Sequence, residues 1–300
     1  MRLSSILTIL DKAKHQQTAL ARSLELQKLS QAHLELIAFR WNAMYDSRTT
    51  LDATQRKKLK RAMVEEAEAW QITLVEELVN GGVPAAALEP RTVWANDIAD
   101  WVRDEVEERP YDLVVKSIHQ QPQGLFYTPT DWNLLRTCPV PVLLTTNKKR
   151  KRSGKIIAAL DFSQTGPKHR HLNMQVLLAA HSMADTFGAK VHCVYALEVS
   201  DVLRDLDIIN AREARQRMLD KAMPDIQRAL DAFGVPVSRR HFPIGKPGQV
   251  VQTKAHQLNA DMIVVGTAAH RVRQMLGLGS TAERILTRAR CDVLAVHPTK

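Results

Sequence analysis

Apolar residues along the chain gather in short continuous runs, and an amphipathic stretch of helical length follows most of them. In the second half the runs are 155–161 (KIIAALD), 191–197 (VHCVYAL), 262–265 (MIVV) and 292–296 (DVLAV), with a more polar candidate strand at 238–244 (SRRHFPI). The helical patterns that are clearest between them cover 174–187, about 203–233 and 250–258. Strands that are continuously apolar are typical of a parallel sheet with helices on both faces. The pattern predicts alternating strands and helices.

The first half of the chain repeats this order. SILTILD (5–11) resembles IIAALDF (156–162), YDLVVKSIH (111–119) resembles ADMIVVGTAAH (260–270), and NLLRTCPVPVLLTT (133–146) resembles RILTRARCDVLAVHP (284–298). The offsets between the matched segments are 150, 149 and 153 residues, so we expect two copies of one domain. The expected domains are 1–147 and 155–300. The basic stretch 148–154 between them is interpreted as a solvated linker, although its KKRKR run also fits a nuclear-targeting signal.

Composition places the chain among globular proteins. Its apolar fraction is 45%, and no run approaches the roughly 18 apolar residues of a membrane span. Residues 3–10 are interpreted as a strand rather than a signal peptide, because no cleavage-type site follows them. The three cysteines, Cys138, Cys193 and Cys291, lack metal-type spacing, which favours buried reduced thiols and a cytoplasmic protein.

The formal charge of +10 is concentrated in the second half. Residues 1–150 hold 20 Lys and Arg against 19 Asp and Glu (+1), whereas residues 151–300 hold 22 against 13 (+9). Such a field favours an anionic ligand or surface. Nucleic acid is not expected as a partner, because aromatic residues are few and we recognise no basic stripe along one helix.

The stretch 264–281 (VVGTAAHRVRQMLGLGST) leads from a predicted strand to a predicted helix. Ligands of parallel sheets bind beyond the carboxyl ends of the strands, where Asp161 and Ala196 are also expected. Its glycines allow backbone N–H groups to approach a phosphate, and the helix start adds a positive dipole. Ser280 and Glu283 equally fit a capping box, with the glycines as turn residues only. A phosphate loop and a plain turn are therefore both open, and the loop is no Walker A motif.

The double domain, the aspartates that end the first strand of each copy and the G-x2-G-x9-G-[ST] spacing of the loop resemble the universal stress protein family over nearly all of the chain. The resemblance implies a Rossmann-related, doubly wound parallel sheet of five strands in each half. It implies that the last strands, about 140–146 and 292–297, pair into an internal pseudo-dimer. It also implies a stress-response protein that holds an ATP-like adenine nucleotide, with magnesium, in its second half. The residues matched to that site are Asp161, Phe162, Ser163, Ala196, Gly266, Ala269, His270, Gly279, Ser280 and Thr281.

One position departs from the family's pattern. Ala269 stands three residues after Gly266, where the pattern has its second glycine, and nine residues then lead to Gly279. If this position needs a left-handed backbone, alanine costs roughly 1–2 kcal/mol, which is about a 5- to 30-fold loss of affinity. The loop residues His270, Arg271 and Arg273 either offset part of this loss by binding phosphates or are solvated.

The first half departs further from the pattern. Lys116 takes the place of Gly266, and the stretch after it lacks the glycine series, although Asp11 is kept. Thr128 and Asp131 fit the cap of a following helix. We expect this half to be degenerate for nucleotide binding, with at most one ligand site per chain.

The sequence carries no motif of a dedicated catalyst. It has neither G-x-S-x-G nor H-E-x-x-H, and His169 with His171 is only a candidate metal pair. We therefore expect a non-catalytic binding or sensing protein, with slow ATP hydrolysis at most. The alternative is a structural or interaction protein whose sheet clefts hold an apolar or lipid-like ligand, or none. Ala158, Ala159, Ala196 and Ala269 fit the lining of such a cleft, and they equally fit the buried alanines of a tight sheet. A homodimer is compatible with both readings.

Overall fold

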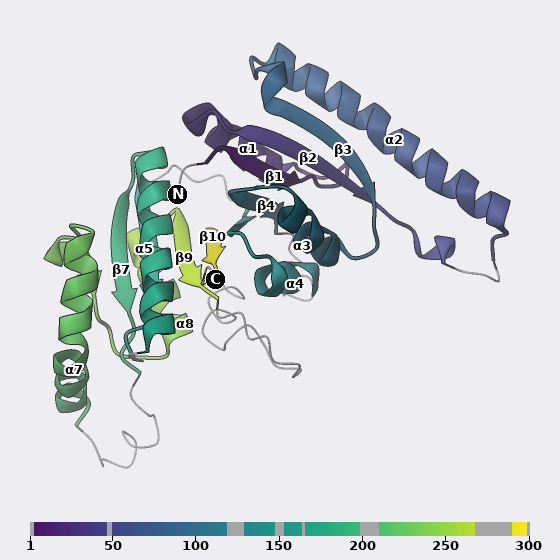
Figure 1. The fold of residues 1–300 in the computed structure, drawn as a ribbon. Helices are drawn as coiled ribbons and strands as arrows, with labels where there is room; N and C mark the ends of the chain where they lie inside the picture. Colours follow the sequence, from purple (N-terminus) through teal and green to yellow (C-terminus); the bar gives the residue numbers. More distant parts are fainter. Residues whose placement is uncertain are drawn as a thin grey trace. The chain divides into compact units, whose positions relative to one another are not determined.

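The computed structural model describes residues 3–46, 50–118, 129–147, 153–163, 166–198, 210–267 and 290–298. Among these residues the chain forms two compact units, one built from residues up to 147 and the other from residues after 152. Each unit is a β-sheet covered by helices (Figure 1). We refer to them as the first and the second half.

The first half alternates strands and helices along the chain. Its elements are β1 (Ser5–Ile9), α1 (Thr18–Ser30), β2 (His33–Arg40), η1 (Ala43–Tyr45), α2 (Ala53–Asn80), η2 (Ala85–Ala87), β3 (Leu88–Trp94), α3 (Ile98–Glu108), β4 (Leu113–Ser117), α4 (Pro129–Thr137) and β5 (Val142–Thr145). The second half follows the same order in its described residues. Its elements are β6 (Lys155–Leu160), α5 (Pro167–Phe187), β7 (Lys190–Tyr195), α7 (Ala211–Ala232), η3 (Val237–Arg239), β8 (Arg240–His241), α8 (Pro247–Leu258), β9 (Met262–Gly266) and β10 (Asp292–Val296).

The two sheets have the same strand order. In the first half the order is β3-β2-β1-β4-β5, and each of these pairings is parallel. In the second half it is β8-β7-β6-β9-β10, again parallel throughout. The order reverses beside β1 and beside β6, so each half is doubly wound, as the sequence predicted.

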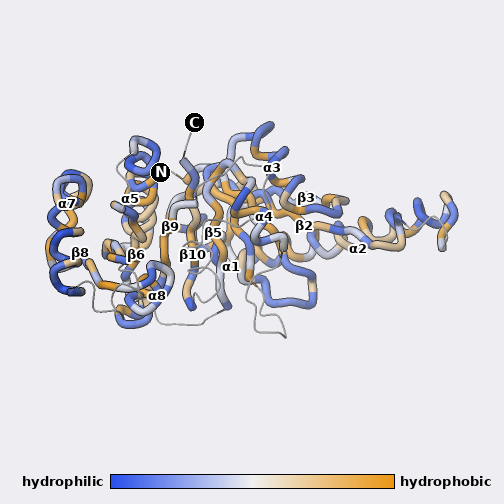
Figure 2. The backbone as a smooth tube through the Cα atoms, turned by 90° about the horizontal axis from the view of Figure 1, so that it is seen from below, coloured by the Kyte–Doolittle hydropathy of each residue, from blue (hydrophilic) through white to orange (hydrophobic). Residues whose placement is uncertain are grey.

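Helices cover both faces of each sheet. Because crossovers between parallel strands are right-handed, α1 and α2 lie on one face of the first sheet, and α3 and α4 lie on the other. By the same rule α5 and α7 share one face of the second sheet, and α8 lies on the opposite one. Figure 2 shows α5 and α8 on opposite sides of strands that carry the apolar colour.

The strands form the core because both of their faces are covered. In β4 and β10 every residue is buried, and in β1, β7 and β9 four or five of each strand's residues are buried. This explains why the apolar runs in the sequence are continuous rather than alternating. Because both faces of each sheet are covered, polar side chains can gather at the carboxyl ends of its strands, which we call the carboxyl edge of the sheet.

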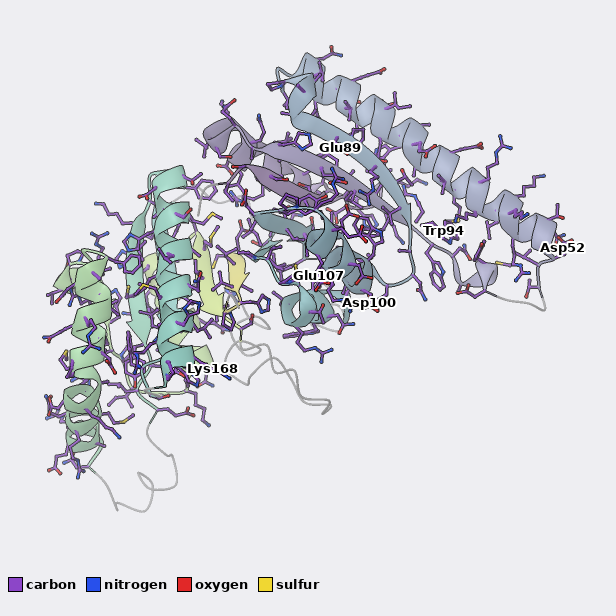
Figure 3. All side chains as sticks on the ribbon, viewed as in Figure 1. Asp52, Glu89, Trp94, Asp100, Glu107 and Lys168 are labelled. Carbon is purple, nitrogen blue, oxygen red and sulfur yellow. The ribbon has the colours of Figure 1, made fainter. Side chains whose placement is uncertain are left out.

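The helix α2 is longer than the sheet that it covers. Its 28 residues span about 42 Å, whereas the seven residues of β3 span about 23 Å. A capping box between Asp52 and Gln55 fixes its start, and Figure 3 shows Asp52 at the end that extends past the sheet. The first turns carry five basic residues, which spread around the helix rather than along one face: Arg56, Lys57, Lys58, Lys60 and Arg61.

The strand predicted at 238–244 is shorter than expected. Only Arg240 and His241 pair with β7, and a single bridge joins Ile244 to Leu197. Pro243 has no N–H to donate to a ladder, which explains the interruption. The helix predicted from about 203 is described from Ala211 onward.

Two predictions about composition are confirmed within the described residues. The three cysteines are buried and free. No helix in the described ranges has both the length and the apolar character that crossing a membrane requires.

An aspartate at the equivalent position in each half holds the start of the central strand, β1 or β6. The carboxylate of Asp112, just before β4, accepts the backbone N–H groups of Ser4 and Ser5 at 2.6 and 3.0 Å. Its counterpart Asp261, just before β9, accepts those of Ser153 and Gly154 at 3.0 and 2.8 Å. The repeat is therefore conserved in hydrogen bonds as well as in strand order.

Candidate functional site

Asp161 follows β6 directly, at the carboxyl edge of the second sheet. Asn173 of α5 holds its backbone: the amide oxygen accepts the Asp161 N–H at 2.9 Å, and the amide nitrogen donates to the Asp161 carbonyl at 2.6 Å. The Asp161 side chain is exposed, and its Oδ1 accepts the N–H and the hydroxyl of Ser163 at 2.9 and 2.6 Å. Its Oδ2 has no hydrogen-bond partner in the described part of the chain, so this oxygen can meet a ligand.

Phe162 points into the core while its neighbours face solvent. Its ring packs edge-to-face on Tyr195, with the centroids 5.4 Å apart. Burial, and then the negative charge of Asp161, raises the pKa of Tyr195, which keeps this phenol neutral. Ala196 follows Tyr195 and is buried. The aromatic pair thus fixes the end of β7 against the end of β6.

Gly266 ends β9 at the same edge, and its lack of a side chain has a packing reason. A Cβ atom built there would lie 2.6–2.9 Å from three side-chain carbons of Leu172 in α5. Gly266 is not among the glycines with positive φ, so close packing of helix on strand, rather than an unusual backbone, requires the glycine. The structure therefore brings Asp161, Ala196 and Gly266 to one edge, as the predicted topology requires.

The remaining predicted loop residues lie outside the described residues. These are Ala269, His270, Gly279, Ser280 and Thr281. Their assignment to a nucleotide site stays a prediction.

Strand register corrects the predicted counterpart of Gly266 in the first half. The N–H of Ile118 donates to the carbonyl of Thr145, and the N–H of Thr267 donates to the carbonyl of Val296, both at 2.9 Å. The residue before Thr267 is Gly266, so its counterpart is Ser117 rather than Lys116. The sequence analysis was wrong here by one position, and Lys116 corresponds to Val265.

Ser117 closes the carboxyl edge of the first half from within. Its hydroxyl donates to Asp11 Oδ2 at 2.5 Å and accepts the backbone N–H of Ala19 at 2.7 Å. Asp11, the counterpart of Asp161, is 9% exposed. Gln17 holds the Asp11 backbone with the same reciprocal amide contacts that Asn173 makes to Asp161. The backbone of the site is shared, but in the first half its carboxylate is directed into the protein.

Lys116 and Asp131 form a buried ion pair beside this position. Lys116 Nζ lies 2.6 Å from Asp131 Oδ1, and their side chains are 10% and 0% exposed. Lys116 Nζ also donates to the carbonyl of Ser117 at 3.1 Å. Asp131 was predicted as part of a helix cap with Thr128, which lies outside the described residues; in the structure its ion pair with Lys116 joins α4 to the end of β4.

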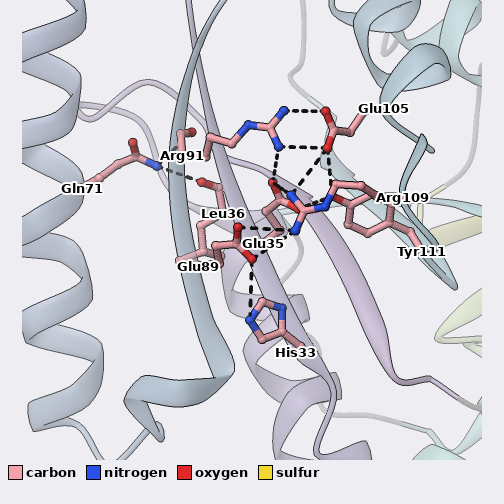
Figure 4. A network of polar contacts seen from close by, with 9 residues as sticks. All are labelled: His33, Glu35, Leu36, Gln71, Glu89, Arg91, Glu105, Arg109 and Tyr111. Atoms are coloured by element: carbon pink, nitrogen blue, oxygen red, sulfur yellow. Dashed lines mark hydrogen bonds and ion pairs between the residues drawn. The ribbon is translucent and has the colours of Figure 1, made fainter. Parts of the chain in front are cut away.

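A charged network lies on the face of the first sheet that α3 covers (Figure 4). Glu35 of β2 is 1% exposed and accepts Arg91 at 2.9 Å and Arg109 at 3.0 Å. Arg91 also pairs with Glu105 of α3, and the Tyr111 hydroxyl donates to Glu35. Hydrogen bonding to Arg91 lowers the pKa of Glu105. Each buried carboxylate thus has a guanidinium partner, as burial of charge requires.

The candidate metal pair is not supported by the fold. His169 and His171 lie in the first turns of α5, where side chains two residues apart point in different directions. Within the described ranges, no three or more His, Cys, Asp or Glu side chains gather as metal ligands would.

Family comparison agrees with the repeat and the fold. The model of the universal stress protein family matches residues 3–146 and again residues 154–297. The chain belongs to the universal stress protein family. Universal stress protein E of Escherichia coli (strain K12) is 27% identical over 304 residues, covering 98% of this chain and 94% of that protein. The universal stress protein E homolog of Haemophilus influenzae is 25% identical, covering 100% and 99%.

Solved structures share the tandem fold. A protein of Pseudomonas aeruginosa PAO1, PA1789, described as functionally unknown, has a TM-score of 0.73 at 22% identity, covering 99% of this chain and 93% of that chain. A universal stress protein from Archaeoglobus fulgidus has a TM-score of 0.66 at 18% identity, covering 99% and 100%. At these identities the likeness concerns the fold.

Sequence reasoning missed several residues that shape the site. Asn173, Tyr195 and Leu172 act on Asp161, Phe162 and Gly266 through tertiary contacts. Asn173 lies 12 residues after Asp161, whereas Gln17 lies six after Asp11, so no constant spacing marks the amide clamp. Only the constant offset between the halves, applied to Gly266, would have identified Ser117.

Proposed function

We propose that the second half binds an adenine nucleotide at the carboxyl edge of β6, β7 and β9, and that it does so as a sensing or storage module without dedicated catalysis. The observation that carries this proposal is the difference between Asp161 and Asp11. Asp161 is exposed with Oδ2 unpartnered in the described part of the chain, whereas Asp11 is buried and bonded to Ser117. A carboxylate oxygen at this edge suits a ribose hydroxyl or an adenine amino group, both of which are donors.

The surrounding residues fit the same ligand. Ala196 and Gly266 leave little side-chain bulk at the ends of β7 and β9, as close approach of a nucleoside needs. The loop from Gly266 to Thr281, with the helix expected after it, would then hold the phosphates and a magnesium ion. We assign Ala269, His270, Gly279, Ser280 and Thr281 to this part of the site by the family pattern.

Slow turnover at most is expected from the chemistry of the site. The described hydrogen bonds of the Asp161 carboxylate come from Ser163 alone, and neither a basic side chain nor a metal-type cluster accompanies it within the described ranges. Acid–base catalysis needs such a group within hydrogen-bonding reach. We therefore propose a binding function, with slow ATP hydrolysis at most.

The test is to titrate the full chain with ATP, with and without magnesium, and to measure the binding affinity by calorimetry. Asp161→Asn should weaken binding about 10- to 100-fold, because a hydrogen bond to a charged group is worth about 1.5–3 kcal/mol. Asp185→Asn, which changes an exposed aspartate of α5, is the matched control and should bind as the parent chain does. Equal affinity in the Asp161→Asn variant and the parent would refute the assignment.

A second variant examines the loop itself. Ala269→Gly restores the second glycine of the family pattern, and we expect it to tighten ATP binding about 5- to 30-fold. Mass spectrometry of the small molecules released from the denatured chain gives an independent readout. An adenine nucleotide near one per chain supports the proposal, and an apolar molecule at that stoichiometry contradicts it.

A further inference from the structure

The face of the second sheet beneath α8 carries a group of basic side chains. Lys155 and Lys190 lie side by side at the starts of β6 and β7, and His192 lies two residues further along β7, so all three point to one face. His241 of β8 lies beside Val194 and points the same way. The helix α8 packs against β6 and β7 and carries a further lysine. We name the group the β7–β8 basic cluster: Lys155, Lys190, His192, Arg239, His241 and Lys254.

Two histidines form the centre of this cluster. His192 Nδ1 lies 3.1 Å from His241 Nε2, and the rings are nearly parallel, with an interplanar angle of 12°. One nitrogen therefore donates its proton to the other. Burial lowers the pKa of His192 to about 4, aided by the charges of His241, Arg239, Lys155 and Lys254. Burial and Lys254 also lower the pKa of His241, so both rings are neutral near pH 7.

The cations around the histidines are not compensated. Within the described residues, Lys155, Arg239 and Lys254 make no ion pair. Asp261 lies at the same end of the sheet, but its carboxylate already accepts the backbone N–H groups at the start of β6. Like charges that converge without a counter-charge destabilise a fold, so this arrangement needs a reason.

The repeat supplies the comparison, because the same place in the first half is the charged network of Figure 4. Leu7 of β1 lies beside Glu35, and its counterpart Ile157 of β6 lies beside His192. His192 therefore takes the place of Glu35. One strand further out, Arg91 lies beside Ile37.

The outer positions correspond in the same way. His241 lies beside Val194, so it takes the place of Arg91, and Arg239 falls two residues before it, where the first half has Glu89. Glu105 lies seven residues before Asp112, and Lys254 lies seven before Asp261. Each of the three carboxylates that balance the first half is thus replaced by a basic residue or a histidine in the second.

We propose that the β7–β8 basic cluster is a binding site for a free dianion of the phosphate type. Four cationic side chains from β6, β7, η3 and α8, with the one imidazole N–H that the bond between the rings leaves free, supply the donors that such an oxyanion needs. The cluster lies toward the amino ends of β6 and β7, whereas Asp161 follows the carboxyl end of β6. The anion site is therefore separate from the nucleotide site proposed above and does not depend on it.

Sulfate and inorganic phosphate are the probes, because sulfate keeps its charge between pH 5.5 and 7.5. The full chain is titrated with each salt in a chloride buffer of constant ionic strength. Two quantities are measured: the midpoint temperature of thermal unfolding, and the NMR chemical shifts of the histidine ring nitrogens. We expect sulfate to raise the midpoint, to perturb the His192 and His241 resonances and to bind more tightly at pH 5.5. Acid favours binding because a bound anion stabilises the protonated rings among Lys155, Lys190, Arg239 and Lys254.

Two variants separate a ligand site from a structural cluster. Lys254→Gln should weaken sulfate binding about tenfold, since it removes one charge-assisted contact. Lys254→Glu restores the carboxylate found in the first half, so it should raise the midpoint without sulfate and abolish the response to sulfate. Lys28→Ala, which removes an exposed lysine of α1, is the matched control and should respond as the parent chain does.

Each result decides the question. Loss of the response in Lys254→Glu, with the two histidine resonances perturbed in the parent, supports the proposal. A response that persists in Lys254→Glu places the anion elsewhere, such as at the nucleotide loop, and overturns it. Stabilisation of the parent by Ni²⁺ but not by sulfate would assign the histidine pair to a metal and overturn it as well.

Discussion

The two halves of the chain share a backbone and differ in how their charged groups are satisfied. At the carboxyl edge, Asp11 is bonded to Ser117 inside the protein, while Asp161 faces solvent with Gly266 in place of that serine. The amide clamps on the two aspartates, by Gln17 and by Asn173, are the same. The serine hydroxyl that occupies one carboxylate oxygen of Asp11 has no counterpart at Gly266, so the Asp161 carboxylate stays available to a ligand.

A second difference lies beneath α3 and α8. In the first half the carboxylates Glu35 and Glu105 are compensated by two guanidinium groups, those of Arg91 and Arg109. In the second half His192, His241 and Lys254 stand at the positions of Glu35, Arg91 and Glu105. The change accounts for part of the uneven charge, +1 in residues 1–150 against +9 in residues 151–300. The two halves of the repeat therefore differ: the buried charges of the first are compensated within the protein, whereas the basic cluster of the second requires a bound anion to compensate it.

The largest expected effect comes from breaking the buried ion pair of the first half. Asp131→Ala leaves the Lys116 ammonium buried without its partner, and we expect a loss of about 3–5 kcal/mol in the free energy of unfolding. Urea denaturation followed by circular dichroism measures it. The double variant Lys116→Met/Asp131→Leu should recover most of the loss. If Asp131→Ala is as stable as the parent, the buried ion pair does not stabilise the first half.

A smaller effect is expected at the glycine of the open edge. Gly266→Ala forces a Cβ against Leu172, and overpacking of this kind costs about 1–3 kcal/mol. Adding Leu172→Ala should relieve the clash, so the two substitutions together should cost less than the sum of their separate effects. Additive losses in urea denaturation would show that packing is not the reason for this glycine.

Acid should distinguish the halves by the pH at which each loses stability. The pKa of His192 and that of His297 fall to about 4 through burial. The unfolded chain therefore binds protons at these groups below about 6.5, and their contribution turns unfavourable as the pH falls from there. Glu105 has its pKa lowered by Arg91, so its contribution is present above its ordinary value of 4.5 and is lost only in stronger acid.

Tryptophan fluorescence can follow this difference, because all five tryptophans lie between residues 41 and 132. In urea denaturation across pH 7 to 4, far-ultraviolet circular dichroism should detect a loss of stability at higher pH than fluorescence does. If the two probes change together at every pH, the histidines of the second half do not control its acid response.

The smallest effect is expected for an exposed pair on α2. Arg61 and Glu65 are 2.6 Å apart, but their side chains are 80% and 57% exposed. Arg61→Ala should leave the free energy of unfolding nearly unchanged, because solvent screens an exposed pair. Urea denaturation of this variant beside Asp131→Ala tests whether burial, rather than the number of ion pairs, decides stability. A loss as large as that of Asp131→Ala would argue against this.

The fold was predictable because two features of the sequence indicate it: the local pattern of apolar residues and the internal repeat. Continuous apolar runs such as that of β9 identify buried parallel strands, and the offset of about 150 residues identifies the duplication. The edge strand β8 was overestimated because Pro243 interrupts a ladder that the residue types alone favour. Pairing of the two halves through their last strands stays a prediction.

The candidate site was predictable only in part. Strand ends at Asp161, Ala196 and Gly266 follow from topology, so their place at one edge could be derived. The residues that hydrogen-bond to the two aspartates, such as Asn173 and Ser117, come from other elements, and no regular spacing in the sequence identifies them. The β7–β8 basic cluster became visible only when strand register placed His192 at the position equivalent to Glu35.

The aspartates before β4 and β9 bear on the order of folding. The bond from Asp112 to Ser4 spans 108 residues, as does that from Asp261 to Ser153. Closing so large a loop delays folding, so each central strand forms this bond only after most of its own half is present. During synthesis the first half is complete in sequence before the second is made. We therefore expect it to acquire its native structure on the ribosome while the strands of the second half are still being translated.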